Sequence, residues 1–408
     1  MDRNFDCIVI GAGAAGMFAA IHSAANGYKT AIIEPNEKVG RKLAITGKGR
    51  CNVTNNCDSD TVMKNVPRNP RFLYSVLSMY SPADVMAFFE NEGVPLKTER
   101  GNRVFPVSDK AYDIVDALFF RMKREGVAII RAKAEDITVS EGFVTGVSTD
   151  KGDFFAPKVI LATGGASYPV TGSTGDGYRM AEKLGHTITP LKPSLVPIET
   201  EENCGEMMGL SLKNAVLSVR DNSKNKVVFS ELGEMIFTHF GVSGPLVLSA
   251  SSRMDEITEG KYTLYVDLKP ALSEEQLDSR VQRDFLERKN MQLDNALRKL
   301  LPEKIILPLL KKCGIDSEKQ CNSVKREERL TLVKTIKAFS LTPTSYRPIS
   351  EAIITDGGVS VKEINPKTME SKIVGGLYFA GEIIDVTGFT GGFNLQIAFS
   401  TGYAAAQF

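Results

Sequence analysis

The hydrophobic pattern of residues 5–34 predicts a strand, a turn, a helix and a second strand. Phe5 to Ile10 is a short apolar run, and Thr30 to Ile33 is another. Short uninterrupted runs of this kind are typical of strands buried on both faces of a parallel sheet. The segment between them, Gly16 to Asn26, is rich in alanine and predicts a helix that ends at Gly27. The chain therefore opens with one β-α-β unit.

Further helices and short strands follow. Residues 70–92 and 108–126 carry apolar side chains at a spacing of three to four, which predicts two helical segments. Residues 127–149 are typical of short strands, and Val159 to Leu161 is a further buried strand that leads into a glycine turn. Residues 35–57 are rich in glycine and basic residues and predict a long loop. Such a loop is uncommon inside a compact domain and is usually functional.

A different pattern begins near residue 192, where apolar and polar positions alternate. The alternation is clearest in Tyr262 to Leu268, which predicts a strand with one buried face. Ser273 and Gln276 then have the spacing of a capping box, so a helix is expected to begin there. Helical patterns, broken at Pro302, continue to about residue 336.

Strand patterns return near residues 338–362, and a second glycine-rich segment occupies 373–408. This order predicts that one domain is interrupted by another. The predicted domains are a dinucleotide-binding domain of residues 1–191 and 350–408, a β-rich insertion of residues 192–272 and 337–349, and a helical sub-insertion of residues 273–336.

Composition points to a soluble cytoplasmic enzyme. The 408 residues include 42% hydrophobic residues and 50 basic against 49 acidic side chains, a formal charge of +1. This balance argues against a partner bound mainly by charge, such as a membrane or a nucleic acid. The polar N-terminus leaves no room for a signal peptide, and no apolar stretch reaches membrane length. Three histidines make a histidine-rich metal site improbable, and the six cysteines form no CxxC pair, as expected for reduced thiols.

The first glycine-rich turn predicts a dinucleotide site. Gly11, Gly13 and Gly16 follow a strand and lead into a helix, where unpaired N–H groups and the helix dipole attract a pyrophosphate. Glu34 ends the next strand, about 20 residues on, where a carboxylate accepts hydrogen bonds from the adenosine ribose. A tight turn whose glycines serve packing alone is the alternative.

Three later segments favour FAD over NAD. The loop from Val39 to Asn52 combines glycines with positive charge, and Ala162 to Gly165 with Asp176 resembles the strand-end turn of two-domain flavoproteins. At the C-terminus, Asp385 is expected near the ribityl hydroxyls, and Gly391 and Gly392 open a last helix aimed at the flavin ring. An exposed turn carboxylate is the alternative for Asp385, and a surface salt bridge is the alternative for Arg50.

The predicted cofactor-binding residues come from all of these segments. They are Gly11, Ala12, Gly13, Ala14, Ala15, Gly16, Glu34, Pro35, Gly40, Arg41, Lys42, Thr46, Gly47, Gly49, Arg50, Cys51, Asn52, Ala134, Ala162, Thr163, Gly164, Gly165, Asp176, Gly381, Glu382, Asp385, Gly391, Gly392, Phe393, Asn394 and Leu395.

Several motifs together resemble the BaiN-like flavoproteins, a family that includes aminoacetone oxidases and a reductase of bile-acid dehydroxylation. The matching segments are Gly40 to Leu43, Gly49 to Asn52, Gly101 to Pro106, Gly165 to Pro169 with Thr171 to Gly175, Phe237 to Pro245, and Gly381 to Gln396. The resemblance implies an α/β fold: a glutathione-reductase-like FAD-binding Rossmann domain with an inserted β-barrel-like domain and a small helical domain. Two positions depart from the family: Lys48 stands where glycine is frequent, and Phe393 stands where tyrosine is common.

The candidate catalytic residues are His239 and Tyr168. A proton donor is needed beside the flavin, and His239 lies in a glycine-framed loop, although a structural role in that loop fits it equally well. A structural role is also the alternative for Tyr168. Cys51 has no CxxC partner, which favours a packed thiol over a redox-active one.

The expected activity is that of a FAD-dependent oxidoreductase acting on a small molecule. We expect NAD(P)H as a transient donor and an activated C=C bond of the enone type as the acceptor. No second glycine-rich fingerprint follows an interior strand, so an amine oxidase that takes electrons from its substrate and forms peroxide remains an alternative. A flavoprotein that modifies RNA is a third reading. Basic residues of the helical block support it, but interleaved acidic residues favour a solvated face.

Overall fold

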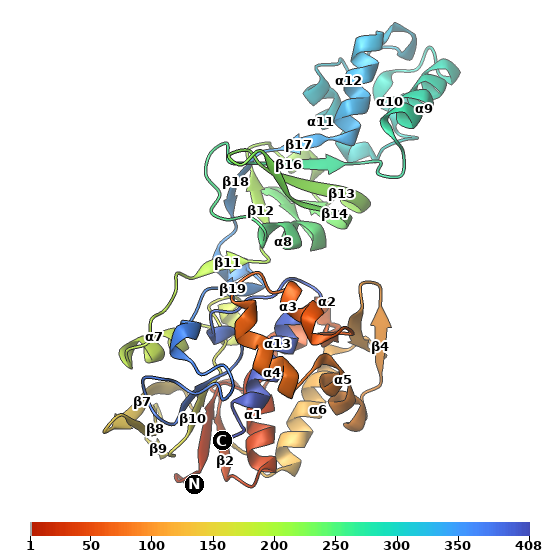
Figure 1. Cartoon of the computed structure of the whole chain (residues 1–408). Helices are drawn as coiled ribbons and strands as arrows, with labels where there is room; N and C mark the ends of the chain where they lie inside the picture. The colour runs from red at the N-terminus through yellow and green to blue at the C-terminus, as the bar shows by residue number, and fades with distance from the viewer. Residues whose placement is uncertain (1) are drawn as a thin grey trace. The chain divides into compact units, whose positions relative to one another are not determined.

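The computed structural model describes residues 2–408 and divides the chain into two compact units. Unit 1 comprises Met1–Pro193 and Ile349–Phe408, and unit 2 comprises Ser194–Pro348. Each unit has its own hydrophobic core. Both termini of the chain therefore belong to unit 1, which unit 2 interrupts (Figure 1).

Unit 1 is built on a five-stranded sheet in the order β20-β10-β1-β2-β6, and all its neighbouring strands are parallel. Every residue of the central strand β1 is buried, as its uninterrupted apolar run predicts. The strands are β1 (Cys7–Ile10), β2 (Thr30–Ile33), β6 (Ala128–Ile130), β10 (Val159–Leu161) and β20 (Leu377–Phe379).

The strand order places a topological switch point between β1 and β10. From β1 the chain crosses to β2 on one side, and β10 pairs with β1 on the other side. Ligands of open parallel sheets bind in the crevice outside the carboxyl ends of the strands at such a point. The segments that follow β1, β2, β10 and β20 are those that carry the predicted cofactor residues.

Helices cover this sheet, and two of them pack closely at the switch point. A Cβ atom on Gly402 of α13 (Phe393–Ala404) would lie 2.6 Å from the Ala15 carbonyl oxygen of α1 (Ala14–Ala25). The two helices lie side by side in Figure 1. The other helices of unit 1 are α2 (Arg41–Gly49), α3 (Ser59–Lys64), α4 (Tyr74–Met79), α5 (Pro82–Asn91), α6 (Ala111–Arg124) and α7 (Asp176–Lys183).

Three smaller sheets follow: β3-β5-β4 and β7-β8-β9 are antiparallel, and the third is the pair β11-β19. Bridges from Asn4 to Phe155 and from Phe143 to Gly375 attach the sheet β7-β8-β9. The strands of these sheets are β3 (Thr54–Asn55), β4 (Leu96–Glu99), β5 (Arg103–Pro106), β7 (Ala134–Ser140), β8 (Phe143–Thr149), β9 (Phe154–Phe155), β11 (Lys192–Ser194) and β19 (Ile354–Asp356).

The loop predicted for residues 35–57 is wrong in part, because α2 occupies its middle. Gly40 begins this helix in a left-handed conformation, and a Cβ there would press on Met17 and Val115. The helix breaks at Thr46 and Gly47, whose backbone angles are not helical. Tertiary packing therefore makes a helix from a sequence that is poor in helical periodicity.

The predicted helix over residues 70–92 is broken near Ser81, where a capping box starts α5. Within residues 2–408 no single helix is long and apolar enough to cross a membrane. The bent pair Pro70–Met79 and Pro82–Asn91 reaches that length and composition only when its two parts are taken together across a 43° bend. Their apolar side chains, such as Val76 and Phe89, are buried in the unit 1 core.

Unit 2 contains a seven-stranded sheet in the order β17-β16-β13-β14-β15-β12-β18, in which the paired strands are antiparallel. In β16 buried and half-buried residues alternate, as the sequence predicts. The elements of this layer are β12 (Ile198–Thr200), β13 (Ser211–Asp221), β14 (Lys226–Phe237), β15 (Gly241–Ser243), α8 (Pro245–Ser251), β16 (Tyr262–Asp267), β17 (Phe339–Leu341) and β18 (Pro343–Tyr346).

A helical block connects β16 to β17. Its first helix starts with the predicted capping box, in which Ser273 and Gln276 hydrogen-bond each other's backbone N–H. The sheet and the block share one core, so a separate domain status for residues 273–336 stays a prediction. The helices are α9 (Glu274–Glu287), α10 (Leu293–Leu297), α11 (Glu303–Cys313) and α12 (Arg326–Lys337).

Candidate functional site

The glycines of the turn after β1 have two different roles, close packing and space for a ligand. A Cβ on Gly16 would lie 1.8 Å from the Gly11 carbonyl oxygen, and a Cβ on Gly11 would lie 2.7 Å from the Ala162 carbonyl oxygen. These two glycines allow α1 to approach β1 and β10. At Gly13, in contrast, a Cβ would meet no atom within 4 Å. Gly13 is the N-cap of α1 and makes no side-chain cap hydrogen bond, so the helix N-terminus opens onto free space.

Glu34 is buried at the end of β2 and faces the same turn. Its Oε2 accepts a hydrogen bond of 2.9 Å from the backbone N–H of Ala12. Its Oε1 accepts hydrogen bonds from the backbone and side-chain amides of Asn36. Asn36 is itself held by Arg41 and by Arg131, the residue after β6. The carboxylate is therefore fixed in position beside the α1 N-terminus, as a ribose ligand must be.

The ends of β10 and β20 meet the same helix turn. The backbone N–H of Ala380 donates to Leu161, and Gly381 would press a Cβ against Ala15 at 2.7 Å. The Gly381 N–H donates to the Thr401 hydroxyl on α13. The structure thus brings together the predicted segments after β1, β2, β10 and β20.

A polar cluster lies beside this junction. The Lys42 ammonium is 2.7 Å from both Ser167 Oγ and Glu382 Oε2. Glu382 Oε1 accepts further hydrogen bonds from Ser167 and from the Thr355 backbone N–H. Because Lys42 and Glu382 neutralise each other in a half-buried setting, the cluster holds α2 to the segment after β20.

The end of α2 is a run of unusual backbone. Gly47, Lys48 and Gly49 all have positive φ, and so does the buried Cys51. Burial raises the pKa of the Cys51 thiol to about 12, so the thiol is neutral and fits the predicted packing role. The next residue, Asn52, presents a buried side-chain oxygen without a hydrogen-bond partner.

Arg50 has partners within the protein. Its guanidinium pairs with Glu99 and Asp109 at 2.5 Å and lies 4.2 Å from the centre of the Phe105 ring. This arrangement is the surface salt bridge considered as the alternative. A contact between Arg50 and the cofactor stays a prediction.

The N-terminus of α13 is also free of a side-chain cap. Gly392 precedes it with a φ of 98°, and a Cβ there would lie 2.3 Å from the Thr54 carbonyl oxygen. Asn55 donates to the Gly391 carbonyl oxygen, which fixes the turn. Asn394 bonds back to Gly388 through both of its amide atoms. The turn therefore fixes the position of a helix N-terminus that no side chain caps and that carries a partial positive charge.

Asp385 is buried and already has partners. Arg68 Nε lies 2.5 Å from Asp385 Oδ1, and Asn69 donates to the other carboxylate oxygen at 3.2 Å. Burial raises the pKa of Asp385 above its usual value, although Arg68 acts in the opposite direction. The sequence did not point to Arg68 or Asn69. A contact of Asp385 with ribityl hydroxyls stays a prediction.

The residues at this edge of the sheet fit FAD. Open space at Gly13 and the uncapped α1 suit a pyrophosphate, Glu34 suits a ribose, and the uncapped α13 suits the electron-rich side of a flavin ring. The unpartnered buried oxygens of Asn52 and Thr163 add polar groups that a ligand could satisfy.

The remaining predicted residues lie in several places. Ala134 starts β7 and is buried, and Asp176 starts α7, where its carboxylate accepts from Thr174. Tyr168 belongs to unit 1, has a φ of 51° and is half-buried. His239 belongs to unit 2, where it is exposed between β14 and β15 against Phe240. Catalytic roles for Tyr168 and His239 stay predictions.

Sequence reasoning missed several residues that organise the site. Glu34 accepts a hydrogen bond from Asn36, and Glu382 accepts hydrogen bonds from Ser167 and Thr355. Beside the α13 turn, the Thr54 hydroxyl donates to the Gln396 side chain. Ser167 and Gln396 lie inside motifs already noted, which was a usable signal. Thr355 carries no such signal, because its partner Glu382 is 27 residues away in the sequence.

Comparison with known proteins identifies the relatives of this chain. The family model described as the HI0933-like protein Rossmann domain matches residues 5–408. The ribosomal RNA dihydrouridine synthase of Escherichia coli (strain K12) is 32% identical over 409 residues, covering 99% of this chain and 98% of that protein. The 3-dehydro-bile acid delta(4,6)-reductase of Clostridium scindens is 31% identical over 415 residues, covering 98% and 97%. The resemblance to BaiN-like flavoproteins is confirmed.

The fold also occurs in a solved structure of low sequence identity. The 3-ketosteroid delta1-dehydrogenase from Sterolibacterium denitrificans superposes with a TM-score of 0.52 at 13% identity, over 99% of each chain. At this identity the likeness concerns the fold alone. The predicted α/β class with a Rossmann-type sheet is confirmed.

We expect Gly13→Val to fold but to lose its flavin. The backbone at Gly13 has φ −82° and ψ −171°, which valine adopts freely, and a Cβ atom there meets no protein atom within 4 Å. The isopropyl group would occupy the space that the pyrophosphate needs, so we expect the flavin-to-protein ratio to fall at least ~10-fold. Absorbance at 450 nm measures the ratio, circular dichroism checks the fold, and Gly13→Ala is the milder control. A yellow Gly13→Val protein of normal stoichiometry would contradict the assigned site.

We expect Lys48→Gly to stabilise the protein. Lys48 is exposed and has a φ of 60°, a conformation that costs a non-glycine residue about 1–2 kcal/mol. Because glycine loses roughly 0.5–1 kcal/mol more chain entropy, the expected net gain in unfolding free energy is ~0.5–1 kcal/mol. Lys48→Ala removes the same ammonium but keeps the strained backbone, so urea denaturation should show no gain for it. Equal effects of the two substitutions would refute strain as the cause.

Proposed function

Because the chain belongs to the HI0933-like family of FAD-dependent oxidoreductases, we propose that it transfers hydride from NAD(P)H to a C=C bond conjugated with a carbonyl group. The observation that carries this proposal is the pair of full-length relatives. One relative is a delta(4,6)-reductase of a 3-dehydro-bile acid, and the other is a dihydrouridine synthase. A 4-ene beside a 3-oxo group and the C5=C6 bond of uracil beside its C4 carbonyl are both activated alkenes.

The proposed reaction is balanced by one hydride and one proton. NAD(P)H loses a hydride and becomes NAD(P)⁺, one alkene carbon gains that hydride, and the other carbon gains a proton. Bound FAD supplies the redox relay between donor and acceptor. The protein's part is to fix the cofactor through the α1 turn, Glu34 and the α13 N-terminus, and to deliver the proton.

Among the described residues, unit 2 has an antiparallel sheet and a helical block rather than a second parallel dinucleotide fold. This supports a single reaction face that NAD(P)H and the oxidised substrate use in turn. The expected kinetic signature is a ping-pong pattern, with parallel lines in double-reciprocal plots. We place the reaction in the cytoplasm, since all six cysteines are free thiols.

The favoured substrate is a uracil base in ribosomal RNA. The Escherichia coli and Haemophilus influenzae relatives, at 32% and 31% identity, are both ribosomal RNA dihydrouridine synthases. The helical block from Ser273 to Lys337 holds 15 basic and 11 acidic residues, while the remainder holds 35 and 38. The basic surplus is therefore local, which the overall charge of +1 conceals. From the sequence alone, a small-molecule substrate was expected instead. A small molecule with an activated C=C bond is therefore the alternative.

We expect NADH or NADPH to bleach the flavin under anaerobic stopped-flow conditions and unmodified ribosomal RNA to restore its colour. Nucleoside mass spectrometry should then find uridine that has gained two hydrogens. Parallel trials use a 3-oxo-4-ene steroid and aminoacetone. Reduction of the steroid alone would support the small-molecule alternative and reject RNA. Bleaching by aminoacetone, but by neither nicotinamide, would overturn the reductase in favour of an oxidase.

Tyr168 is the proton donor that we propose for this reaction. It lies in unit 1, in the loop after the Ala162 to Gly165 turn, and strained backbone of this kind collects at active sites. We expect Tyr168→Phe to leave flavin reduction by NAD(P)H unchanged and to slow substrate reduction ~10²-fold. His239→Gln is the comparison variant. Slowing by the histidine change and not by the tyrosine change would reassign the donor.

A further inference from the structure

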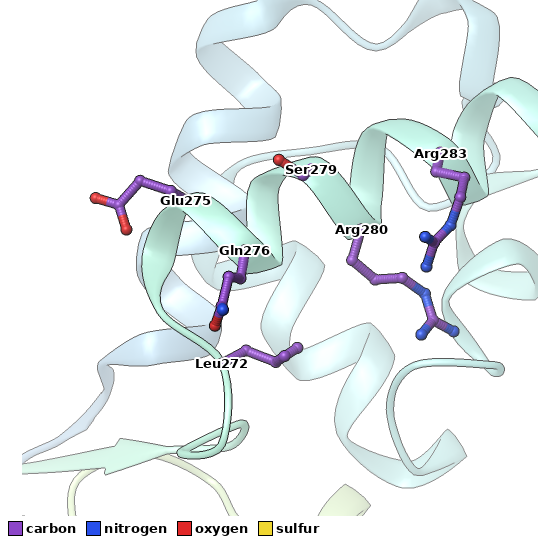
Figure 2. Close-up of a pocket in the computed structure, with 6 residues that line it drawn as sticks. All are labelled: Leu272, Glu275, Gln276, Ser279, Arg280 and Arg283. Carbon is purple, nitrogen blue, oxygen red and sulfur yellow. The ribbon is translucent and has the colours of Figure 1, made fainter.

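A surface pocket of about 390 Å³ lies on α9 of the helical block. Figure 2 shows its lining: Leu272, Glu275, Gln276, Ser279, Arg280 and Arg283. Apart from Leu272 at the base and Glu275, these side chains carry hydrogen-bond donors. The Arg280 and Arg283 guanidinium groups extend to the same side of the helix (Figure 2).

The two arginines differ in how they are held. Arg280 Nε lies 3.0 and 2.8 Å from the two carboxylate oxygens of Asp284, and this pair fixes the guanidinium while its outer nitrogens stay available. Arg283 is exposed and forms no ion pair with any residue in the described range 2–408. One cation of the pocket is thus preorganised, and the other is free to close on a ligand.

A third cation lies close to Arg280. Lys269 precedes α9, is half-buried, and has no carboxylate bound to its ammonium among the described residues. Burial lowers the pKa of Lys269, and the charge of Arg280 lowers it further. Lys269 has no bound carboxylate of its own, so an anion at this place would relieve its repulsion by Arg280.

The surrounding carboxylates are occupied elsewhere. Asp278 pairs with Arg329, and Asp267 pairs with Lys337, each at 2.7 Å. Glu275 accepts from the Ser273 hydroxyl and remains the one lining carboxylate of the pocket. Lys269, Arg280 and Arg283 therefore exceed Asp284 and Glu275 by one positive charge.

We propose that this α9 pocket binds a backbone phosphate of the RNA substrate, with Arg280 and Arg283 as its charged contacts. The inference rests on the proposed function, because it takes RNA as the substrate. Guanidinium groups contact phosphate oxygens with two parallel N–H donors, and Ser279 and Gln276 add neutral donors. The site positions the RNA and reads no base, so its contribution is independent of sequence.

The test measures RNA affinity of the whole flavoprotein, separately from turnover. The probe is a set of fluorescent transcripts of unmodified ribosomal RNA fragments, titrated over a range of salt concentrations. Arg283→Glu changes an exposed residue with no partner, so folding should be preserved. We expect it to weaken binding ~10-fold or more and to reduce the slope of log affinity against log salt by about 1.

Two further variants make the result specific. Ser279→Glu puts a carboxylate into the pocket without removing any cation and should weaken binding in the same way. Lys311→Glu reverses an exposed charge on α11 of the same block that has no ion-pair partner among residues 2–408. It should change affinity less than ~3-fold. Flavin content and bleaching by NAD(P)H should be normal in all three.

Equal loss in Arg283→Glu and Lys311→Glu would overturn the site, because it would indicate diffuse charge attraction. Normal RNA affinity in Arg283→Glu and Ser279→Glu would overturn it as well. RNA binding that depends on Arg283 in a protein that reduces no uridine would contradict the proposed function while preserving the pocket. Uridine reduction together with unaltered RNA affinity in both pocket variants would contradict the pocket and support the proposed function.

Discussion

The site depends on how closely the first turn of α1 approaches the ends of β1 and β10. At Gly16 the approach leaves no room for a Cβ, and Gly381 and Gly402 bring β20 and α13 onto Ala15. These contacts come from opposite ends of the chain, so unit 1 assembles only when its N-terminal and C-terminal segments are joined. The same contacts fix the positions of two helix N-termini that no side chain caps. Gly16, Gly381 and Gly402 therefore serve close packing, whereas Gly13 leaves space for the cofactor.

Short sequence patterns were enough to predict the elements that form because of residues close together in the sequence. The strand Thr30–Ile33 and the capping box of Ser273 and Gln276 appear as predicted, since burial and capping are visible in short windows. The helix Arg41–Gly49 was missed because two glycines and three basic residues among its nine positions hide its apolar face. It is held by Gly40 against Met17 and Val115, contacts that no local window contains.

The same division applies to the site. Glu34 was predicted because its spacing from the glycine turn follows from the β-α-β geometry. The pairs Lys42–Glu382 and Arg68–Asp385 were not predicted, because their members are more than 300 residues apart and no periodicity links them. For Arg50 the structure supplies protein partners where the motif alone suggested a ligand. A charged residue in a cofactor motif is thus weaker evidence for binding than a glycine facing open space.

The net charge of the whole chain and the net charge of the helical block lead to different conclusions about RNA. A formal charge of +1 argued against RNA, yet the helical block carries a surplus of four positive charges and the rest a deficit of three. Electrostatic attraction of a polyanion falls off within about 10 Å at 0.1 M salt, so the block is what an RNA phosphate would sense. Interleaved acids reduce this attraction whether or not they are paired, and the surplus of four remains after all of them are counted. Near α9, Asp278 and Asp284 are bound by arginines, and the exposed Arg283 is left to act on the solvent side.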